Sequence, residues 1–315
     1  MVAFLDFEKP VAELRTRIDE LRETAEANGA LEIDAEVGRL QQRSDKLLKE
    51  LYAKLSPWQK TQVARHPERP HLKDYVAGFA SEFVPLAGDR AFADDQAIIG
   101  GLACIGGRKV MIVGHEKGED TASRLRHNFG MAKPEGYRKA IRLMQLADRF
   151  GLPVVTLVDT AGAFPGVQAE ERGQAEAIAR STEQCLALGV PMVAAIVGEG
   201  GSGGAVALAA ANRVLMFEHA IYSVISPEGA SSILWRTADR APDAAEAMKV
   251  TAADLHKLGV VDRIVAEPMG GAHRDPAAAI ATLGAAIGEE LDALAQDGRE
   301  ALIARRRAKF LNMGA

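Results

Sequence analysis

The chain has 315 residues, of which 48% are hydrophobic and 26% charged, and its formal net charge is −5 at pH 7. This composition is typical of a folded globular protein, and the acidic balance argues against a nucleic-acid-binding protein, which usually carries a basic surface. The two cysteines, Cys104 and Cys185, are too few for a cysteine zinc site or a disulfide framework. We therefore expect no metal in this chain.

The N-terminal sequence lacks a basic segment followed by an apolar stretch, which is the pattern of a signal peptide. No run of the sequence approaches the ~18 apolar residues that span a bilayer. Two isolated cysteines are typical of reduced thiols in a reducing compartment. We expect a cytoplasmic protein without a membrane span.

Residues 1–60 are predicted to form a helical region. Apolar residues recur at steps of three and four in two stretches, on either side of Asn28-Gly29, and this spacing indicates two amphipathic helices. The first stretch contains Val11, Leu14, Ile18 and Leu21, and the second contains Val37, Leu40, Leu47, Leu48 and Leu51. Two helices joined by a short polar loop make a helical hairpin. It has two possible roles: an arm that docks another subunit, or a lid packed on its own domain.

A polar, proline-rich link from Arg65 to Pro70 indicates a boundary, and residues 61–295 are predicted to form an α/β domain. Gly106-Gly107 between two apolar runs predicts a β-hairpin. Strands and helices then alternate, which is typical of a layered fold with largely parallel strands. The predicted strands are 154–158, 192–197, 214–217 and 221–225, and the predicted helices are 135–150, 169–188 and 205–211, with another helix capped by Ser226.

Residues 296–315 are predicted to form a basic C-terminal helical tail. Arg305, Arg306 and Arg307 lie near the end of the predicted helix. Cations there offset the negative end of the helix dipole. We expect all three side chains to be solvated.

Two glycine-rich segments carry the candidate chemistry: residues 159–166, DTAGAFPG, and residues 198–205, GEGGSGGA. Each follows a predicted buried strand and precedes a predicted helix. At such a turn, backbone N–H groups point outward from the start of a helix, where the dipole attracts negative charge. Glycine allows a substrate oxygen to approach closely. This is the arrangement that an oxyanion hole requires.

The second segment also fits two unrelated patterns. Gly198, Gly200 and Gly203 satisfy the dinucleotide fingerprint G-x-G-x-x-G, with Glu218 at a plausible distance to bind a ribose. The triplet Gly200, Ser202 and Gly204 satisfies the G-x-S-x-G pattern of serine hydrolases. Both patterns are weak in a glycine-rich turn. A dinucleotide-binding oxidoreductase and a serine hydrolase therefore stay as alternatives.

Longer motifs resemble a known family over nearly the whole chain. They read FLDFEKPVAEL, RHPERP, AGDRAFADDQAIIGG, GHEKG, RHNFGMAKPEGYRKAIRLMQLADRF, AEERGQAEAIAR, GEGGSGGA, YSVISPEGASSILW and EPMGGAHRDP. In this order they closely resemble the alpha subunits of multi-subunit bacterial acetyl-CoA carboxylase carboxyltransferases. The family pattern has Pro and Tyr where this chain has Ala161 and Phe164. Ala161 frees an N–H and loosens the turn, and Phe164 excludes catalysis by a side-chain hydroxyl at that position.

The resemblance implies a crotonase-like (ClpP/crotonase) α/β fold, a spiral of ββα units. It implies transfer of a carboxyl group from carboxybiotin to acetyl-CoA, which gives malonyl-CoA for fatty acid biosynthesis. It also implies that the N–H groups of Gly203 and Gly204 hold the biotin oxygen. The residues expected to line the same substrate cleft are Gly162, Ala163, Phe164, Pro165, Gly166, Gly200, Gly201 and Ser202.

The resemblance further implies partners. A zinc-containing beta subunit of related fold would complete an alpha2beta2 carboxyltransferase. The biotin would be carried covalently by a biotin carboxyl carrier protein, and biotin carboxylase would belong to the wider complex. On this basis the chain would be active only together with the beta subunit.

Overall fold

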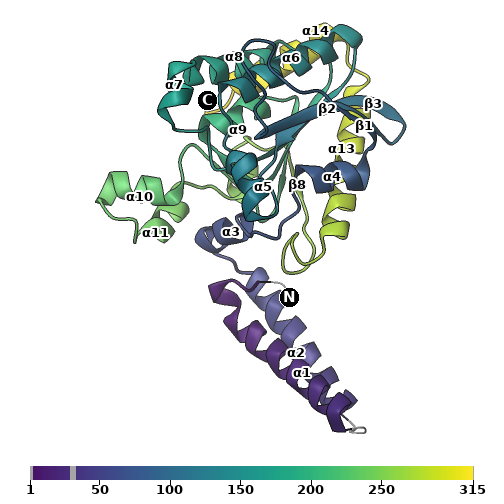
Figure 1. The fold of residues 1–315 in the computed structure, drawn as a ribbon, viewed down its shortest axis with the longest axis vertical. Coiled ribbons are helices and arrows are strands. Elements are labelled where there is room, and N and C mark those ends of the chain that lie inside the picture. Colours follow the sequence, from purple (N-terminus) through teal and green to yellow (C-terminus); the bar gives the residue numbers. More distant parts are fainter. Residues whose placement is uncertain (1–2, 29–32, 315) are drawn as a thin grey trace.

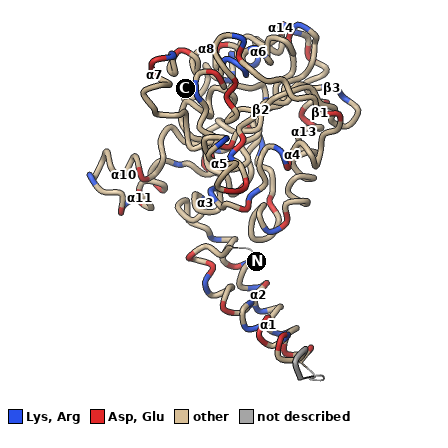
Figure 2. Tube along the Cα trace, viewed as in Figure 1, with Lys and Arg blue, Asp and Glu red and all other residues tan. Residues whose placement is uncertain are grey.

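A helical hairpin extends from an α/β body in the structure, a computed structural model that describes residues 3–28 and 33–314 (Figure 1). The hairpin consists of α1 (Lys9–Asn28) and α2 (Asp34–Tyr52), as the apolar spacing predicts. The predicted break after Asn28 falls on Gly29, which lies outside the described residues. Because the hairpin points away from the body, it does not cover the α/β domain as a lid would. Acidic and basic residues alternate along both helices (Figure 2).

The base of the hairpin is fixed to the body by a buried polar contact. Glu8, which is fully buried, accepts hydrogen bonds from Arg274 at 2.7 Å and from the Tyr52 hydroxyl at 2.9 Å. Val11 and Leu48 pack beside them in a small apolar cluster. A buried carboxylate requires such partners. The N-terminal end of α1 and the C-terminal end of α2 are therefore anchored, while the tip extends outward.

In the described residues, eight strands form one sheet in the order β1-β2-β3-β4-β5-β6-β8, and β7 pairs with β5 beyond the end of β6. Their bounds are β1 (Ser81–Pro85), β2 (Ile98–Ile105), β3 (Arg108–His115), β4 (Val154–Thr160), β5 (Met192–Gly201), β6 (Arg213–Phe217), β7 (Ile221–Ser223) and β8 (Arg263–Val265). The β2–β3 pair is the predicted antiparallel hairpin, and β3 to β6 are parallel. Every residue of β4 and β5 is buried, because helices cover both faces of the central sheet.

The helices of the body are α3 (Pro57–Ala64), α4 (Leu72–Phe79), α5 (Thr121–Arg126), α6 (Pro134–Phe150), α7 (Val167–Glu171), α8 (Gln174–Ala187), α9 (Ser202–Ala209), α10 (Pro227–Trp235), α11 (Ala241–Ala247), α12 (Ala252–Lys257), α13 (Pro276–Leu294) and α14 (Arg299–Leu311). Ser226 caps α10 as predicted, since its side chain accepts a hydrogen bond from the N–H of Gly229. No helix in the described part of the chain combines the length and hydropathy of a membrane span.

Several predicted boundaries are wrong. The helix predicted over 205–211 is α9, which begins at Ser202 and ends at Ala209, and the strand predicted over 154–158 continues to Thr160. The helix predicted over 169–188 is divided into α7 and α8, because Gly173 lies in the left-handed region with φ +81°. The strand predicted to end at residue 197 continues to Gly201, so most of the second glycine segment is strand rather than turn. The strand predicted over 221–225 ends at Ser223.

The predicted solvation of the basic tail is wrong for Arg306. This side chain is fully buried, and it donates to the carbonyl oxygens of Leu188 at 2.6 Å and Val190 at 3.1 Å, and also to Asn212. Burial lowers the pKa of its guanidinium to about 10. Arg305 does extend into solvent. Arg306 therefore attaches α14 to the α/β body.

Candidate active site

The two glycine segments meet at the carboxyl ends of β4 and β5. A Cβ atom on Gly201 would lie 2.1 Å from the carbonyl oxygen of Ala161, and one on Gly204 would lie 2.8 Å from the carbonyl carbon of Gly162. Only glycine permits such close backbone approach. The strand and glycine pattern predicted each turn separately, the family resemblance implied one cleft for both, and the structure brings them into direct contact.

The N–H groups of Gly203 and Gly204 lie in the first turn of α9 (Ser202–Ala209). Ser202 begins this helix with φ +54°, an uncommon conformation for a residue with a side chain. Gly201 stands at the N-cap position and has no side chain that could accept a hydrogen bond. The first N–H groups of a helix have no acceptor within the helix. Gly203 is partly exposed and Gly204 is buried.

The part of the first segment that follows β4, residues 161–166, is held in place by its neighbours. The N–H of Phe164 donates to the carbonyl oxygen of Ala132 at 3.0 Å, and Gln174 donates to the carbonyl oxygens of both residues. The Phe164 ring lies against Gly166, where a Cβ would come within 2.2 Å of the ring. Within the segment, Gly162 is buried, Ala163, Phe164 and Gly166 are partly exposed, and Ala161 and Pro165 are exposed. The loop that contains Ala132 therefore belongs to the site.

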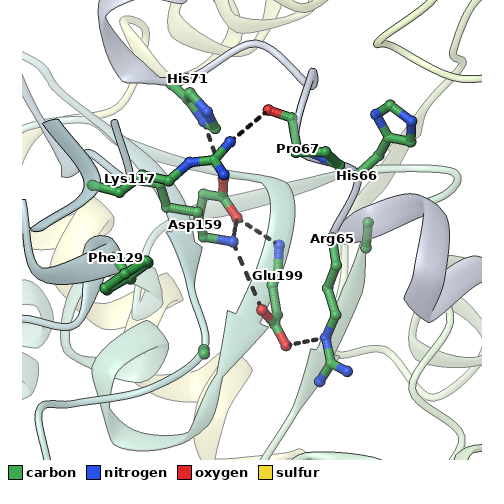
Figure 3. Close-up of a pocket in the computed structure, with 11 residues that line it drawn as sticks. Arg65, His66, Pro67, His71, Lys117, Phe129, Asp159 and Glu199 are labelled. Atoms are coloured by element: carbon green, nitrogen blue, oxygen red, sulfur yellow. Dashed lines mark hydrogen bonds and ion pairs between the residues drawn. The ribbon is translucent and has the colours of Figure 1, made fainter. Parts of the chain in front are cut away.

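A pocket of about 220 Å³ opens beside Ala161 and contains a chain of charged side chains (Figure 3). Lys117 lies 2.6 Å from Asp159 and 3.7 Å from Glu199. Glu199 also accepts a hydrogen bond from Arg65 at 2.7 Å. The proline-rich link 65–70, predicted to be a boundary, thus contributes to the wall of this pocket.

The side chains of Asp159 and Arg69 bond to backbone groups where the pairing of two strands is irregular. The pairing of β4 with β5 shifts between Val158 and Thr160, so the ladder is interrupted there. Asp159 accepts from the N–H of Glu199 at 2.8 Å, and Arg69 donates to the carbonyl oxygen of Val197 at 2.7 Å. Two buried charged side chains therefore replace ladder bonds next to the glycine turns.

The electrostatics of the pocket favour an ionised Asp159. Burial alone would raise the pKa of this carboxyl group, but the Lys117 ammonium, the nearby His71 ring and the hydrogen bond from the Glu199 N–H hold the pKa far below its ordinary value. His115, buried nearby on β3, has its pKa lowered to about 4 because burial disfavours the charged ring. It is neutral near pH 7.

The structure gives little support to a serine hydrolase. Ser202 does lie at a strand-to-helix turn with positive φ, as a nucleophile would. However, no histidine in the described part of the chain hydrogen-bonds to Ser202. His66 and His127 contact the backbone carbonyl oxygens of Ala3 and Gln96, respectively.

The dinucleotide interpretation is not supported either. Gly198 and Gly200 belong to β5, whereas the fingerprint needs them in the turn before a helix. Glu218 accepts a hydrogen bond from the N–H of Glu267 at 2.7 Å, next to the hairpin base.

Sequence reasoning missed the charged residues of the pocket. Arg65, Lys117 and Arg124 lie between predicted elements, and isolated charges in such places usually indicate solvated loops. For Arg65 and Lys117, the available signal was their position inside the long motifs RHPERP and GHEKG; Arg124 lies in neither motif. In the described residues, no three side chains of His, Cys, Asp or Glu are grouped as a metal site.

Comparison with solved structures shows the fold. Transcarboxylase 12S aligns with a TM-score of 0.59 at 20% identity over 73% of this chain and 42% of that chain. A Pseudomonas malonate decarboxylase hetero-tetramer contains a chain that aligns with a TM-score of 0.59 at 18% identity, over 74% of this chain and 90% of that one. The predicted crotonase-like α/β fold is confirmed.

Comparison with sequences shows the family. A family model described as acetyl co-enzyme A carboxylase carboxyltransferase-like matches residues 4–314. The acetyl-coenzyme A carboxylase carboxyl transferase subunit alpha of Rhizorhabdus wittichii is 78% identical, and that of Zymomonas mobilis is 68% identical, each over 100% of both chains. These full-length matches, together with the fold, show that the chain belongs to the acetyl-CoA carboxylase carboxyltransferase alpha-subunit family.

Proposed function

We propose that this chain supplies the biotin side of a two-chain carboxyltransferase site that makes malonyl-CoA from acetyl-CoA. The observation that carries the proposal is the contact between the two glycine turns at the first turn of α9. There, the N–H groups of Gly203 and Gly204 would donate to the ureido oxygen of biotin. The substrate cleft would be lined by residues 162–166 and 200–202.

Carboxyl transfer from carboxybiotin to acetyl-CoA depends on stabilising negatively charged oxygen atoms and does not require a base from the protein. Carboxybiotin breaks its N–CO2 bond and gives CO2 and a biotin with negative charge on its ureido oxygen. This biotin removes a proton from the methyl group of acetyl-CoA, and the resulting enolate attacks CO2 to give malonyl-CoA. Negative charge develops on one oxygen of biotin and one of the thioester. Preorganised N–H donors are well suited to both.

The partners of the proposed complex follow from the family. A zinc-containing beta subunit would hold the thioester oxygen and most of the CoA, and two copies of each chain would form an alpha2beta2 assembly. A biotin carboxyl carrier protein would deliver the biotin that biotin carboxylase has carboxylated. The names of the full-length relatives, which specify a subunit alpha, support an incomplete site in this chain.

Reconstitution tests the proposal. The full chain is purified alone and after co-expression with the beta-type subunit from the same genome, and malonyl-CoA formation and zinc content are measured. We expect activity and zinc only in the two-chain complex. Robust activity of this chain alone would contradict the subunit assignment. Labelling of Ser202 by a fluorophosphonate, or tight binding of NADH, would favour one of the alternatives.

A further inference from the structure

An aromatic residue is held in an unfavourable backbone conformation at the edge of the pocket. Asn128, Phe129 and Gly130 have consecutive positive φ angles of 47°, 55° and 76°. Asparagine and glycine tolerate this left-handed region, but a bulky aromatic residue rarely adopts it. Such conformations gather at functional sites, where the surrounding structure enforces them.

The surroundings of Phe129 fix its backbone from both sides. On one side, His127 contacts the carbonyl oxygen of Gln96 at 2.7 Å, and the Asn128 amide donates to the carbonyl oxygen of Met131 at 2.7 Å. On the other side, Gly130 is so closely packed that a Cβ there would lie 2.9 Å from the Asp159 carbonyl oxygen and 3.0 Å from Lys117 Cγ. The segment is therefore attached to the charged cluster of the pocket.

The fixed backbone places an apolar ring where it is not used for packing. Phe129 is 46% exposed and lines the same pocket as Ala161 of the first glycine turn. In Figure 3 the ring lies across the pocket from Arg65, with Asp159 and Glu199 between them. An exposed ring in a strained conformation contributes little to folding, so a role in binding explains it better.

The rest of the pocket suits a flat, polar ligand with a negative charge. Arg124 donates to the carbonyl oxygens of Gly118 at 3.3 Å and Pro67 at 3.2 Å, and among the described residues no carboxylate forms an ion pair with it. Its charge is therefore available to an anion. The carboxylates of Asp159 and Glu199 can accept hydrogen bonds from ligand N–H groups.

We propose that Phe129 is a substrate-binding residue that stacks on the flat ureido ring of carboxylated biotin, with Arg124 facing its carboxylate. This inference depends on the proposed function, because it assigns the aromatic contact of the same site. A ureido ring has two polarised faces and N–H and carbonyl groups at its edge. It can therefore stack on an aromatic ring while its edge meets the polar wall of the pocket.

Phe129→Asn in the reconstituted two-chain complex tests this role. The reaction is measured in reverse, with free biotin as the carboxyl acceptor and malonyl-CoA as the donor. Loss of the stacking ring should raise the KM for biotin about tenfold. The KM for malonyl-CoA should not change. Because asparagine tolerates a positive φ, the melting temperature should stay equal or rise, which separates a binding role from a structural one.

Three further variants complete the test. Phe129→Tyr keeps the ring and should keep the KM for biotin, whereas Phe129→Leu should raise it even if the asparagine variant fails to fold. Lys249→Asn is a matched control, since Lys249 also has a positive φ of 55° and is exposed, but does not line the pocket. It should change neither KM.

Several results would overturn the inference. A wild-type KM for biotin in both Phe129→Asn and Phe129→Leu would exclude stacking. A raised KM for malonyl-CoA instead would assign the ring to the acyl-CoA, and loss of the complex on size exclusion would assign it to the subunit interface. If the wild-type complex makes no malonyl-CoA, the proposed function fails, and calorimetry of biotin binding to wild type and Phe129→Asn then decides the role of Phe129.

Discussion

Adding a single methyl group at Gly204 should test whether the contact between the two glycine turns matters for activity. In Gly204→Ala the new Cβ would lie 2.8 Å from the carbonyl carbon of Gly162 and 2.9 Å from the nitrogen of Ala163. Both are backbone atoms, so the first turn must move. Gly203→Ala is the matched comparison, because its Cβ would meet only the side chain of Ile178, at 3.2 Å.

The expected magnitudes differ between the two neighbours. A Cβ normally stays beyond about 3.4 Å, so the turn at Gly162 must shift by roughly half an ångström. Forced overpacking of this kind costs about 1–3 kcal/mol of stability. A displacement of about 1 Å in a catalytic arrangement can cost about a hundredfold in rate. We expect Gly204→Ala to lose roughly ten- to a hundredfold in kcat. Gly203→Ala keeps its N–H, and we expect a loss below about tenfold.

The assay is malonyl-CoA formation by the reconstituted complex at saturating substrates, with thermal unfolding followed by circular dichroism. Both variants are assayed well below their melting temperatures. If the folded Gly204→Ala complex is as active as Gly203→Ala, contact between the turns does not set the position of the donors. A Gly203→Ala complex that is equally inactive would show that helix geometry, rather than the turn contact, is limiting.

Three further predictions concern the charged groups and the hairpin. Arg306→Met should destabilise the chain by about 3 kcal/mol or more, because it leaves buried acceptors unpaired. Arg305→Ala removes an exposed side chain and should cost less than about 1 kcal/mol. Urea unfolding of both variants measures the difference, and equal free energies of unfolding would contradict the buried contacts of Arg306. Because the pKa of Asp159 is lowered in the folded state, the ionised carboxylate stabilises the fold above its unfolded pKa of about 4, and this stabilisation is lost as pH falls. Asp159→Asn should therefore destabilise the chain at pH 7 and flatten the dependence of its stability on pH between about pH 4 and pH 2. An acid-unfolding profile equal to that of the wild type would refute this linkage. Deleting residues 1–55 should weaken binding to the beta subunit more than it lowers the melting temperature, as size exclusion and calorimetry can show; unchanged assembly would assign the hairpin a purely structural role.

The elements that could be predicted from sequence are those whose pattern is local. The amphipathic spacing around Leu14 and Leu47 predicted both helices of the hairpin, and Gly106-Gly107 predicted the turn between β2 and β3. The division of helix 169–188 was missed because a left-handed φ at Gly173 depends on where α7 packs. A glycine inside a periodic stretch does not show by itself whether the helix continues.

Arg306 shows a second limit of sequence reasoning. Its sequence context, Arg305-Arg306-Arg307, is typical of a solvated helix end. The acceptors that bury it come from Leu188, Val190 and Asn212, which lie about a hundred residues earlier in the chain. Only the tertiary structure brings together a donor with several N–H groups and three acceptors that need them. The burial of a single charged residue therefore could not be read from the charge pattern.

The candidate site combines both kinds of information. Glycine turns after β4 and β5 are visible in the sequence because a strand, a glycine cluster and a helix follow one another. Their contact was not predictable, since it depends on the pairing of β4 with β5 and on the shift between Val158 and Thr160. The motif resemblance identified the family, but the residues that line the pocket, such as Lys117, were found only in the structure.

The buried charges near the site have a physical explanation in the irregular sheet. Arg69 lies 2.8 Å from Glu267, and both side chains are buried. Burying an ion pair rarely stabilises a protein more than an apolar contact would, so stability alone does not account for this pair or for Asp159 with Lys117. However, the shift between β4 and β5 interrupts the ladder beside Glu199 and Val197, and unpaired backbone groups are costly. Asp159 and Arg69 supply hydrogen-bond partners there. The ion pairs then neutralise the two charges, so that the register of β4 and β5 can shift just before the two glycine turns meet.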